Sequence, residues 1–379
     1  MTSANTIINT SKSDDSESMS PPTLELFVPG RICLFGEHSD WAGGFRRDDP
    51  EIPVGKCLIS GTNQGLYARV SKCCDDQLIL KSNLDHGEHM EITIPLNDED
   101  LLIEATSNSL WSYICGVTFQ MRKKFPQIGG LVLDNYKTTL PVKKGLSSSA
   151  AVCVLTARAF NQLYALNLTK REEMEFAFLG ETTTPSKCGR MDQGCAYGIK
   201  PVLMIFDGDT LEVNENVEIG APIHLILVDL CASKNTPAIL SDLHKAYPKA
   251  SCDITRGVQK LLGEVNHSIM DDALQALRQG CAKSIGAIMV QAQKEFDLYA
   301  IPASTHLISP VLHRLLAHEP LQQYVYGGKG VGSQGDGSAQ FVAKSLSDQE
   351  AAIRMIEKDF GMTCLPLTLG ERELALTLE

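Results

Sequence analysis

The sequence predicts an α+β protein of two lobes, and three observations lead to this fold class. The chain has 379 residues, more than one ordinary core accommodates. Strand patterns dominate its first half, and amphipathic helical patterns follow a turn-rich stretch at about residues 205–222. We therefore expect a disordered tail at residues 1–24, an N-terminal domain at 25–210 and a C-terminal domain at 211–379.

The N-terminal elements follow from hydrophobic spacing. Residues 25–35 form an apolar strand interrupted at Pro29–Gly30, and residues 65–72 and 77–83 alternate as paired strands do. Further strands are expected at residues 52–60, 89–96, 129–136, 200–209 and 223–231. Helices are expected at residues 109–125, 148–163 and 171–181. In the C-terminal half, helical spacing marks residues 239–247, 254–265, 271–280, 282–299 and 309–319, before a glycine-rich loop and strand at 325–345.

Charge and cysteine usage restrict the possible partners. The formal net charge is −12, which disfavours nucleic acid and anionic membranes as partners. No apolar run is long enough to span a bilayer, and the polar N-terminus lacks the apolar core of a signal peptide. Twelve scattered cysteines without a CxxC pair argue against a structural zinc site and indicate reduced thiols. We expect a cytoplasmic protein.

The first candidate site is the stretch PGRICLFGEHSDWAGG, which brings Arg31, Glu37, His38 and Asp40 to the end of a strand. Such a concentration of hydrogen-bonding groups suits a polyol substrate. The alternative is a charged surface loop with no ligand.

The second is PVKKGLSSSAA, where a glycine and three serines open a helix. A helix N-terminus presents free N–H groups and the positive end of the helix dipole, and small side chains let an anion approach. The alternative is an ordinary serine N-cap.

The third is GETTTPSKCGRMDQG, which contains Glu181 and Asp192. Two carboxylates separated by a loop could serve one metal ion and one proton. The alternative for each carboxylate is a structural hydrogen bond at a helix end or turn.

In this order and spacing, the three stretches resemble the motifs of the GHMP kinases, and in particular the galactokinase family. GLSSSAA resembles the family's phosphate loop, CGRMDQ resembles its catalytic segment, and GGKGVGSQGDGSAQFV lies where its glycine-rich third motif belongs. The resemblance implies a ribosomal-protein-S5-like N-terminal lobe and a C-terminal lobe with a helix-covered antiparallel sheet. It also implies ATP and Mg²⁺ as cofactors.

The resemblance assigns roles to individual residues. They are Asp192 and Arg31 as the catalytic pair; Glu37, His38, Asp40 and Gly189 for the sugar; Lys144, Gly145, Leu146, Ser147, Ser148, Ser149 and Ala150 for ATP; and Ser149 and Glu181 for Mg²⁺.

The implied reaction is in-line transfer of the γ-phosphoryl group to a monosaccharide of the galactose, pentose or uronic acid class, by a monomer or homodimer. A weakly catalytic sugar- and ATP-responsive regulator is one alternative, although the intact serine segment favours catalysis. The other is a related enzyme that acts on an isoprenoid precursor such as mevalonate.

Five residues, in three places along the chain, depart from the family pattern. Trp41 replaces the usual tyrosine and alters the expected pocket wall. Arg46 and Arg47 either clamp a carboxylate-bearing sugar or form a solvated surface pair. Gln334 and Asp336 occupy positions where the third motif usually has small residues, and a carboxylate there must face away from phosphate or help to hold metal.

Overall fold

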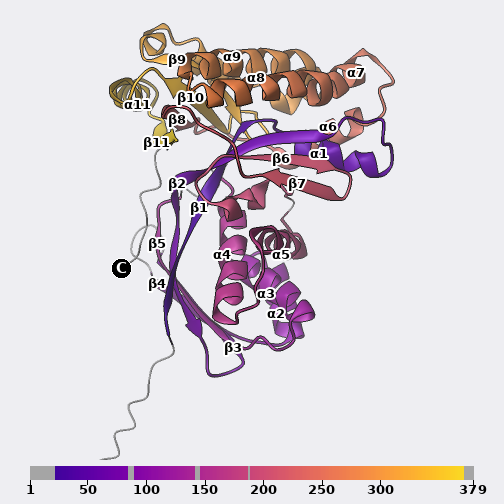
Figure 1. The fold of residues 1–379 in the computed structure, drawn as a ribbon, viewed down its shortest axis with the longest axis vertical. Coiled ribbons are helices and arrows are strands. Elements are labelled where there is room, and N and C mark those ends of the chain that lie inside the picture. The colour runs from indigo at the N-terminus through magenta and orange to yellow at the C-terminus, as the bar shows by residue number, and fades with distance from the viewer. Residues whose placement is uncertain (1–21, 84–88, 141–145, 187, 371–379) are drawn as a thin grey trace, which may run out of the picture.

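The computed structural model describes residues 22–83, 89–140, 146–186 and 188–370 (Figure 1). Residues 1–21 of the expected tail lie outside these ranges, and so do Lys144 and Gly145 of the expected phosphate loop.

A seven-stranded sheet forms the N-terminal lobe. Its strands are β1 (Leu24–Phe35), β2 (Gly55–Lys72), β3 (Gln77–Asn83), β4 (His89–Pro95), β5 (Leu131–Thr138), β6 (Val202–Asp207) and β7 (Thr210–Asn214). They are ordered β4-β3-β5-β2-β6-β7, with β1 paired to β2. Residues 65–72 of β2 and 77–83 of β3 were expected to pair with each other, but β5 lies between these two strands. Strand β3 pairs instead with β4 in antiparallel and with β5 in parallel orientation. The sheet register shifts between Pro29 and Arg31, where the sequence indicated an interruption.

The helices of the N-terminal lobe are α1 (Ser39–Gly44), α2 (Asp98–Thr106), α3 (Ser112–Lys124), α4 (Ser148–Leu163) and α5 (Lys170–Thr183). Of these, α1, α2 and α4 contact the sheet, whereas α3 and α5 pack on α4 and on each other (Figure 1). The small residues Ala150, Ala151 and Cys153 are fully buried, which lets α4 lie close against β1 and β2. A capping box between Thr169 and Glu172 fixes the start of α5.

The C-terminal lobe is an antiparallel sheet covered by helices, as the family resemblance implied. Its strands are β8 (Ile223–Asp229), β9 (Val325–Val331), β10 (Ser338–Ala343) and β11 (Thr363–Leu369), in the order β11-β8-β10-β9. Its helices are α6 (Thr236–Ala246), α7 (Asp253–Lys260), α8 (Asn266–Arg278), α9 (Ala282–Tyr299), α10 (Pro310–Leu316) and α11 (Leu346–Phe360). Figure 1 shows α8 and α9 side by side along the outer edge of this lobe.

Alternation along β8 explains why both faces of this sheet are covered. Leu225 and Leu227 join the apolar core that includes α8 and α9, whereas Ile226 and Val228 join a second core with α10 and α11. A strand buried on both faces carries a nearly continuous apolar run, which is what residues 223–231 show.

The chain passes from one sheet to the other between Asn214 and Ile223. The hairpin of β6 and β7 pairs with β2 through β6 and so belongs to the first sheet. The division expected at residues 210/211 therefore falls at the start of β7, a few residues before the change of sheet.

Candidate active site

Arg31, Ser147 and Asp192 meet at one point, although 116 and 161 residues separate Arg31 from the other two. The Arg31 guanidinium in β1 donates through Nη2 to Asp192 Oδ1 and to Ser147 Oγ, and it forms an ion pair with Asp192. Ser147 Oγ in turn donates to Asp192 Oδ1 at 2.9 Å. The backbone N–H of Arg31 also bonds Leu146 O at 3.0 Å, so β1 holds the end of the serine segment. The three sequence motifs thus converge on one cluster.

Two nitrogens of Arg31 have no partner among the described residues. Arg31 is only 3% exposed, and its Nε and Nη1 atoms are buried without a hydrogen bond to this part of the chain. Leaving such N–H groups unsatisfied costs free energy, which an anionic ligand would offset. Within the described chain, both hydrogen bonds to the Asp192 side chain go to Oδ1, so Oδ2 remains available to accept a proton.

The start of α4 presents a second set of donors. Ser147 precedes the helix in the left-handed conformation, with φ 54° and ψ 48°, and its side chain does not cap the first turn. The N–H groups of Ser148, Ser149 and Ala150 have no intrahelical acceptor at this position, and the helix dipole adds positive potential there. These residues fit the phosphates of ATP.

The predicted metal pair is also brought together. Ser149 Oγ donates to Glu181 Oε1 at 2.7 Å, and Gln193 Nε2 donates to Glu181 Oε2 at 2.8 Å. Burial raises the pKa of Glu181, which is 1% exposed, while the bonds from Ser149 and Gln193 lower it. No lysine or arginine of the described residues pairs with this carboxylate, so a cation would supply the missing positive charge.

This donor set fits Mg²⁺. Among the described residues no cluster of three or more histidine, cysteine or acidic side chains could hold a metal. Mg²⁺ commonly takes only one or two protein oxygens and completes its octahedral shell with waters and substrate phosphates. Ser149 and Glu181 are such a pair.

Ser149→Ala tests this assignment. The exchange removes one oxygen donor, so we expect a higher Mg²⁺ requirement and a lower turnover, measured by titrating Mg²⁺ at saturating ATP. Ser148→Ala is the matched control, because that hydroxyl has no contact with Glu181 and the exchange keeps the backbone amide. An unchanged Mg²⁺ requirement in Ser149→Ala would show that the hydroxyl is not a ligand.

Asp40 lies against Gly189, whose carbonyl accepts a hydrogen bond from the N–H of Asp192 at 3.4 Å. A Cβ atom at Gly189 would lie 1.7 Å from Asp40 Oδ2, so only glycine leaves room for this carboxylate. Burial raises the pKa of Asp40. Hydrogen bonds from the N–H groups of Trp41 and Met191 and the positive charge of Arg31 lower it, but by less. A sugar contact by Asp40 or Gly189 stays a prediction.

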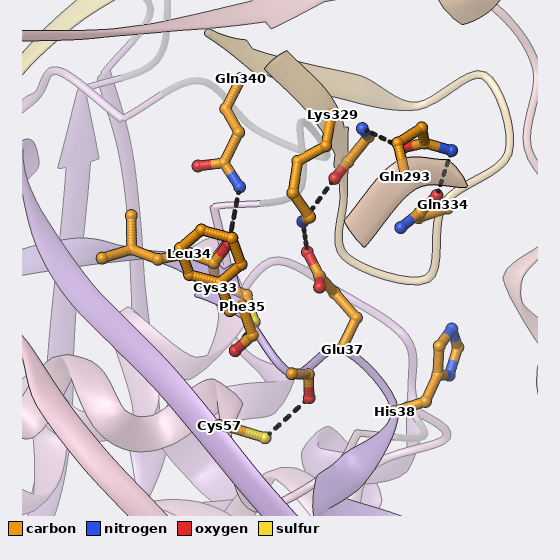
Figure 2. A network of polar contacts seen from close by, with 12 residues as sticks. Cys33, Leu34, Phe35, Glu37, His38, Cys57, Gln293, Lys329, Gln334 and Gln340 are labelled. Atoms are coloured by element: carbon orange, nitrogen blue, oxygen red, sulfur yellow. Dashed lines mark hydrogen bonds and ion pairs between the residues drawn. The ribbon is translucent and has the colours of Figure 1, made fainter. Parts of the chain in front are cut away.

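Glu37 has a partner inside the protein. It forms a buried ion pair with Lys329 of β9, whose Nζ also donates to Gly330 O at 2.8 Å (Figure 2). Burial raises the pKa of Glu37, and Lys329 acts in the opposite direction. Gln340 Nε2 donates nearby to the carbonyls of Cys33 and Leu34 at 3.0 and 3.2 Å. These contacts fasten the end of β1 to the second sheet, and a sugar contact by Glu37 stays a prediction.

Both ring nitrogens of His38 are engaged as well. Trp41 Nε1 donates to His38 Nδ1 at 3.1 Å, which leaves Nε2 as the nitrogen that donates to Ser333 O at 3.3 Å. Burial lowers the pKa of His38 to about 4. The His38 ring is therefore neutral near pH 7. Its bond to Ser333 joins the strand-end stretch at residues 29–44 to the glycine-rich segment at residues 327–342.

This neutral histidine predicts an acid-sensitive fold. His38 takes up a proton near pH 6.5 in the unfolded chain but only near pH 4 in the folded one, so stability is present above pH 6.5 and is lost as pH falls toward 4. Between pH 7 and 5 the expected loss is about 2 kcal/mol. Urea unfolding at both values should show a smaller loss for His38→Gln than for the unaltered protein. Equal losses would contradict the assignment.

Three of the side chains that depart from the family pattern have ion-pair or hydrogen-bond partners within the protein. Arg46 Nε pairs with Asp207 at 2.5 Å, and Arg47 pairs with Asp209 at 2.7 Å, both at the hairpin of β6 and β7. This favours the surface-pair interpretation over a carboxylate clamp. Asp336 accepts from the N–H groups of Val311 and Leu312 at 3.4 and 3.2 Å, so its carboxylate faces the start of α10.

An aromatic wall lies beside His38. The Trp41 ring centroid is 4.2 Å from that of His244 and 5.7 Å from that of Tyr247 in an edge-on arrangement. Tyr247 is 1% exposed and its hydroxyl has no hydrogen-bond partner within the described structure. The Tyr247 ring therefore lies inside an apolar cluster against which Trp41 and Phe45 pack.

Comparison with known proteins agrees with this geometry. Residues 103–198 match the family model described as GHMP kinases N terminal domain. The galactokinase of Thermotoga petrophila is 25% identical over 309 residues, covering 73% of this chain and 79% of that relative. The galactokinase of Clostridium acetobutylicum is 31% identical over 194 residues, covering 49% of this chain and 45% of that relative.

Solved structures show the same fold. Lactococcus lactis galactokinase complexed with galactose aligns with a TM-score of 0.68 at 17% identity, over 91% of this chain and 92% of that one. L. major mevalonate kinase in complex with R-mevalonate aligns with the same TM-score of 0.68 and 17% identity, over 92% and 97%. The segment at residues 103–198 is therefore similar to the N-terminal domain of GHMP kinases, and over most of its length the chain is similar to galactokinases.

Sequence reasoning missed Lys329 and Tyr247. Lys329 stands inside the glycine-rich motif GGKGVG, where a lone cation among glycines was a usable signal. Tyr247 carried no comparable signal, because its burial depends on tertiary packing.

Proposed function

We propose that this protein is an ATP-dependent sugar kinase that phosphorylates a monosaccharide hydroxyl by direct in-line transfer. The observation that carries the proposal is the cluster of Arg31, Ser147 and Asp192 at the start of α4, with buried Arg31 donors unused and Asp192 Oδ2 free. This cluster supports the proposal because it combines a carboxylate that can accept a proton with a cation beside the start of α4.

Each residue then has a task in the transfer. Asp192 Oδ2 accepts the proton of the acceptor hydroxyl as the oxygen attacks phosphorus. The free N–H groups of Arg31 bind oxygens of the transferring phosphoryl group, whose transition state needs positioning and charge compensation more than covalent help. Ser148, Ser149 and Ala150 hold the remaining phosphates through backbone N–H groups. Mg²⁺, when bound by Ser149 and Glu181, neutralises phosphate charge.

The acceptor class rests on the residues near Asp192 and on the relatives. Asp40 offers a carboxylate for sugar hydroxyls, and the aromatic wall around Trp41 suits the apolar face of a sugar ring. The sequence relatives reported above are named galactokinases. We favour galactose and related pentoses over uronic acids, because Arg46 and Arg47 are already paired.

A cytoplasmic location and a monomer or homodimer complete the proposal. All twelve cysteines are free, which fits a reducing compartment. No helix of the described residues is long and apolar enough to cross a membrane.

An acceptor panel tests the function. ADP release is measured with galactose, pentoses, galacturonic acid, mevalonate and homoserine, with Asp192→Asn as the control for contaminating activity. We expect one or more sugars to stimulate ADP release and mevalonate to be inactive. Because the fold is equally similar to a mevalonate kinase, stimulation by mevalonate alone would assign the protein to the isoprenoid alternative. Binding of sugar and ATP without turnover would indicate the regulatory alternative.

A further inference from the structure

Gln193 is buried where the two helices of the predicted metal pair meet the segment that carries Asp192. It is the second residue of the short 3₁₀ helix Asp192–Tyr197, and its side chain is fully buried. This short helix packs against α4, which carries Ser149, and against α5, which carries Glu181. The chain therefore places an uncharged amide, with one donor group and one acceptor atom, beside the metal pair.

The orientation of the Gln193 amide follows from its neighbours. Nε2 donates to Glu181 Oε2 at 2.8 Å and to Cys188 Sγ at 3.4 Å. An ionised carboxylate can only accept hydrogen bonds, so the amide nitrogen and not the amide oxygen must face Glu181. The oxygen Oε1 is then turned away from Glu181 Oε2, and it is buried without a hydrogen bond from any described residue.

The contacts of Nε2 alone do not account for this oxygen. A buried acceptor without a donor costs free energy, and in native proteins such a group commonly bonds an ordered water or a ligand. Oε1 is attached to the same carbon atom as Nε2, so it lies close to the carboxylate of the metal pair. The unpartnered acceptor therefore fits a donor group that arrives together with the cation.

Hydrated Mg²⁺ supplies such donors. An Mg²⁺ ion held by one or two protein oxygens keeps several of its waters, and the charge of the ion makes those waters strong hydrogen-bond donors. Ser149 Oγ and Glu181 Oε1 lie together at 2.7 Å, while Gln193 holds the other oxygen of the same carboxylate. Gln193 thus fixes which oxygen of Glu181 faces Ser149.

We propose that Gln193 is a positioning residue of the magnesium site: its Nε2 holds the Glu181 carboxylate toward Ser149, and its Oε1 accepts a hydrogen bond from a water on Mg²⁺. This assignment rests on the proposed function insofar as Mg²⁺ accompanies ATP, but not on the identity of the acceptor. Replacement of a side chain that hydrogen-bonds a metal ligand commonly lowers metal affinity about 10–100-fold.

Nucleotide binding at graded Mg²⁺ concentrations tests the assignment without any acceptor. Calorimetry measures the affinity for the non-hydrolysable ATP analogue AMPPNP, first in EDTA and then with increasing Mg²⁺, for the unaltered protein and for Gln193→Met. We expect Gln193→Met to raise the half-saturating Mg²⁺ concentration about 10–100-fold but to bind AMPPNP in EDTA as the unaltered protein does. An unchanged Mg²⁺ requirement, equal weakening with and without Mg²⁺, or Mg²⁺-independent binding by the unaltered protein would overturn the proposal.

Gln349→Met is the matched control. Gln349 is a buried glutamine of α11, and its Nε2 also donates to two acceptors, Leu225 O at 2.7 Å and Leu367 O at 3.2 Å, in the C-terminal sheet. We expect this exchange to lower thermal stability and to leave the Mg²⁺ requirement unchanged. An equal rise in the Mg²⁺ requirement of both variants would show a general loss of packing and would contradict a specific role for Gln193.

Gln193→Glu separates the two atoms of the amide. It keeps an oxygen in place of Oε1 but replaces the donor Nε2 with a second acceptor that faces Glu181. Because two adjacent carboxylates repel each other, thermal melting in EDTA should show a destabilised protein that Mg²⁺ restores. We expect its Mg²⁺ requirement to lie closer to that of the unaltered protein than to that of Gln193→Met. A requirement as high as in Gln193→Met would refute the contact between Oε1 and a metal-bound water.

Kinetics distinguish failure of this assignment from failure of the proposed function. With whichever acceptor supports turnover, Gln193→Met should lose rate at limiting Mg²⁺ and regain most of it as Mg²⁺ is raised. A loss that Mg²⁺ does not relieve would show that Gln193 acts through Asp192, its neighbour in the chain, and would overturn the proposal. If AMPPNP binding shows the expected Mg²⁺ dependence while no sugar supports turnover, the sugar kinase proposal fails and the assignment of Gln193 stands.

Discussion

Asp192→Asn is expected to lower kcat by about 10²–10⁴-fold, the usual contribution of a general base. Asparagine keeps the shape and can still accept from Arg31 and Ser147 through its amide oxygen, but it cannot take the proton of the acceptor hydroxyl. ATP binding should survive, because the phosphates are held at the start of α4. The rate is measured by single-turnover transfer with saturating acceptor and ATP.

Folding must be checked in parallel. Arg31 is buried, so Asp192→Asn also removes the charge that balances its guanidinium, and such a loss destabilises a protein. Thermal melting and AMPPNP binding show whether the variant is folded. A folded variant that transfers phosphoryl at a near-normal rate would mean that Asp192 is structural and that another group or water takes the proton.

Arg31→Met is expected to have the next largest effect, a loss of about 10²–10³-fold in kcat, as for removal of one preorganised donor to developing charge. Arg31→Lys should rescue little, because one ammonium cannot reproduce the guanidinium that bonds Ser147 and Asp192 while presenting two further N–H groups.

The double variant tests whether Arg31 and Asp192 act as one unit. If they serve the same transition state, the combined loss should be smaller than the product of the two single losses. Fully multiplicative losses, with all variants folded, would show that the two residues act independently and would contradict a shared cluster.

The sequence predicted the parts of the fold that have strong local patterns. Residues 77–83 and 282–299 agree with β3 and α9 to the residue, because alternation and helical spacing there are unbroken. It missed α2, α11 and β11. The start of α11 was nevertheless visible, since Ser345 caps the helix by accepting from Asp348 N at 3.1 Å. Sheet order could not be predicted, because pairing of β3 with β5 joins segments that are distant along the chain.

For the candidate site, too, some features could be predicted from the sequence and others only from the structure. The resemblance to the family motifs singled out Arg31, Ser149, Glu181 and Asp192, and the structure brings Arg31 to Asp192 and Ser149 to Glu181. What the sequence could not supply was the partner of each polar group. Glu37 was expected to face a sugar, yet it pairs with Lys329, which comes from the other lobe.

The most direct test of the central claim is a rapid-quench experiment with ATP labelled on the γ-phosphoryl group, excess galactose or the best sugar of the panel, and enzyme in excess over ATP. The account predicts that label appears in a sugar phosphate in a one-to-one ratio with ADP, and that Asp192→Asn slows this transfer. Label that appears only in inorganic phosphate, or only in phosphomevalonate when mevalonate is supplied, would contradict it.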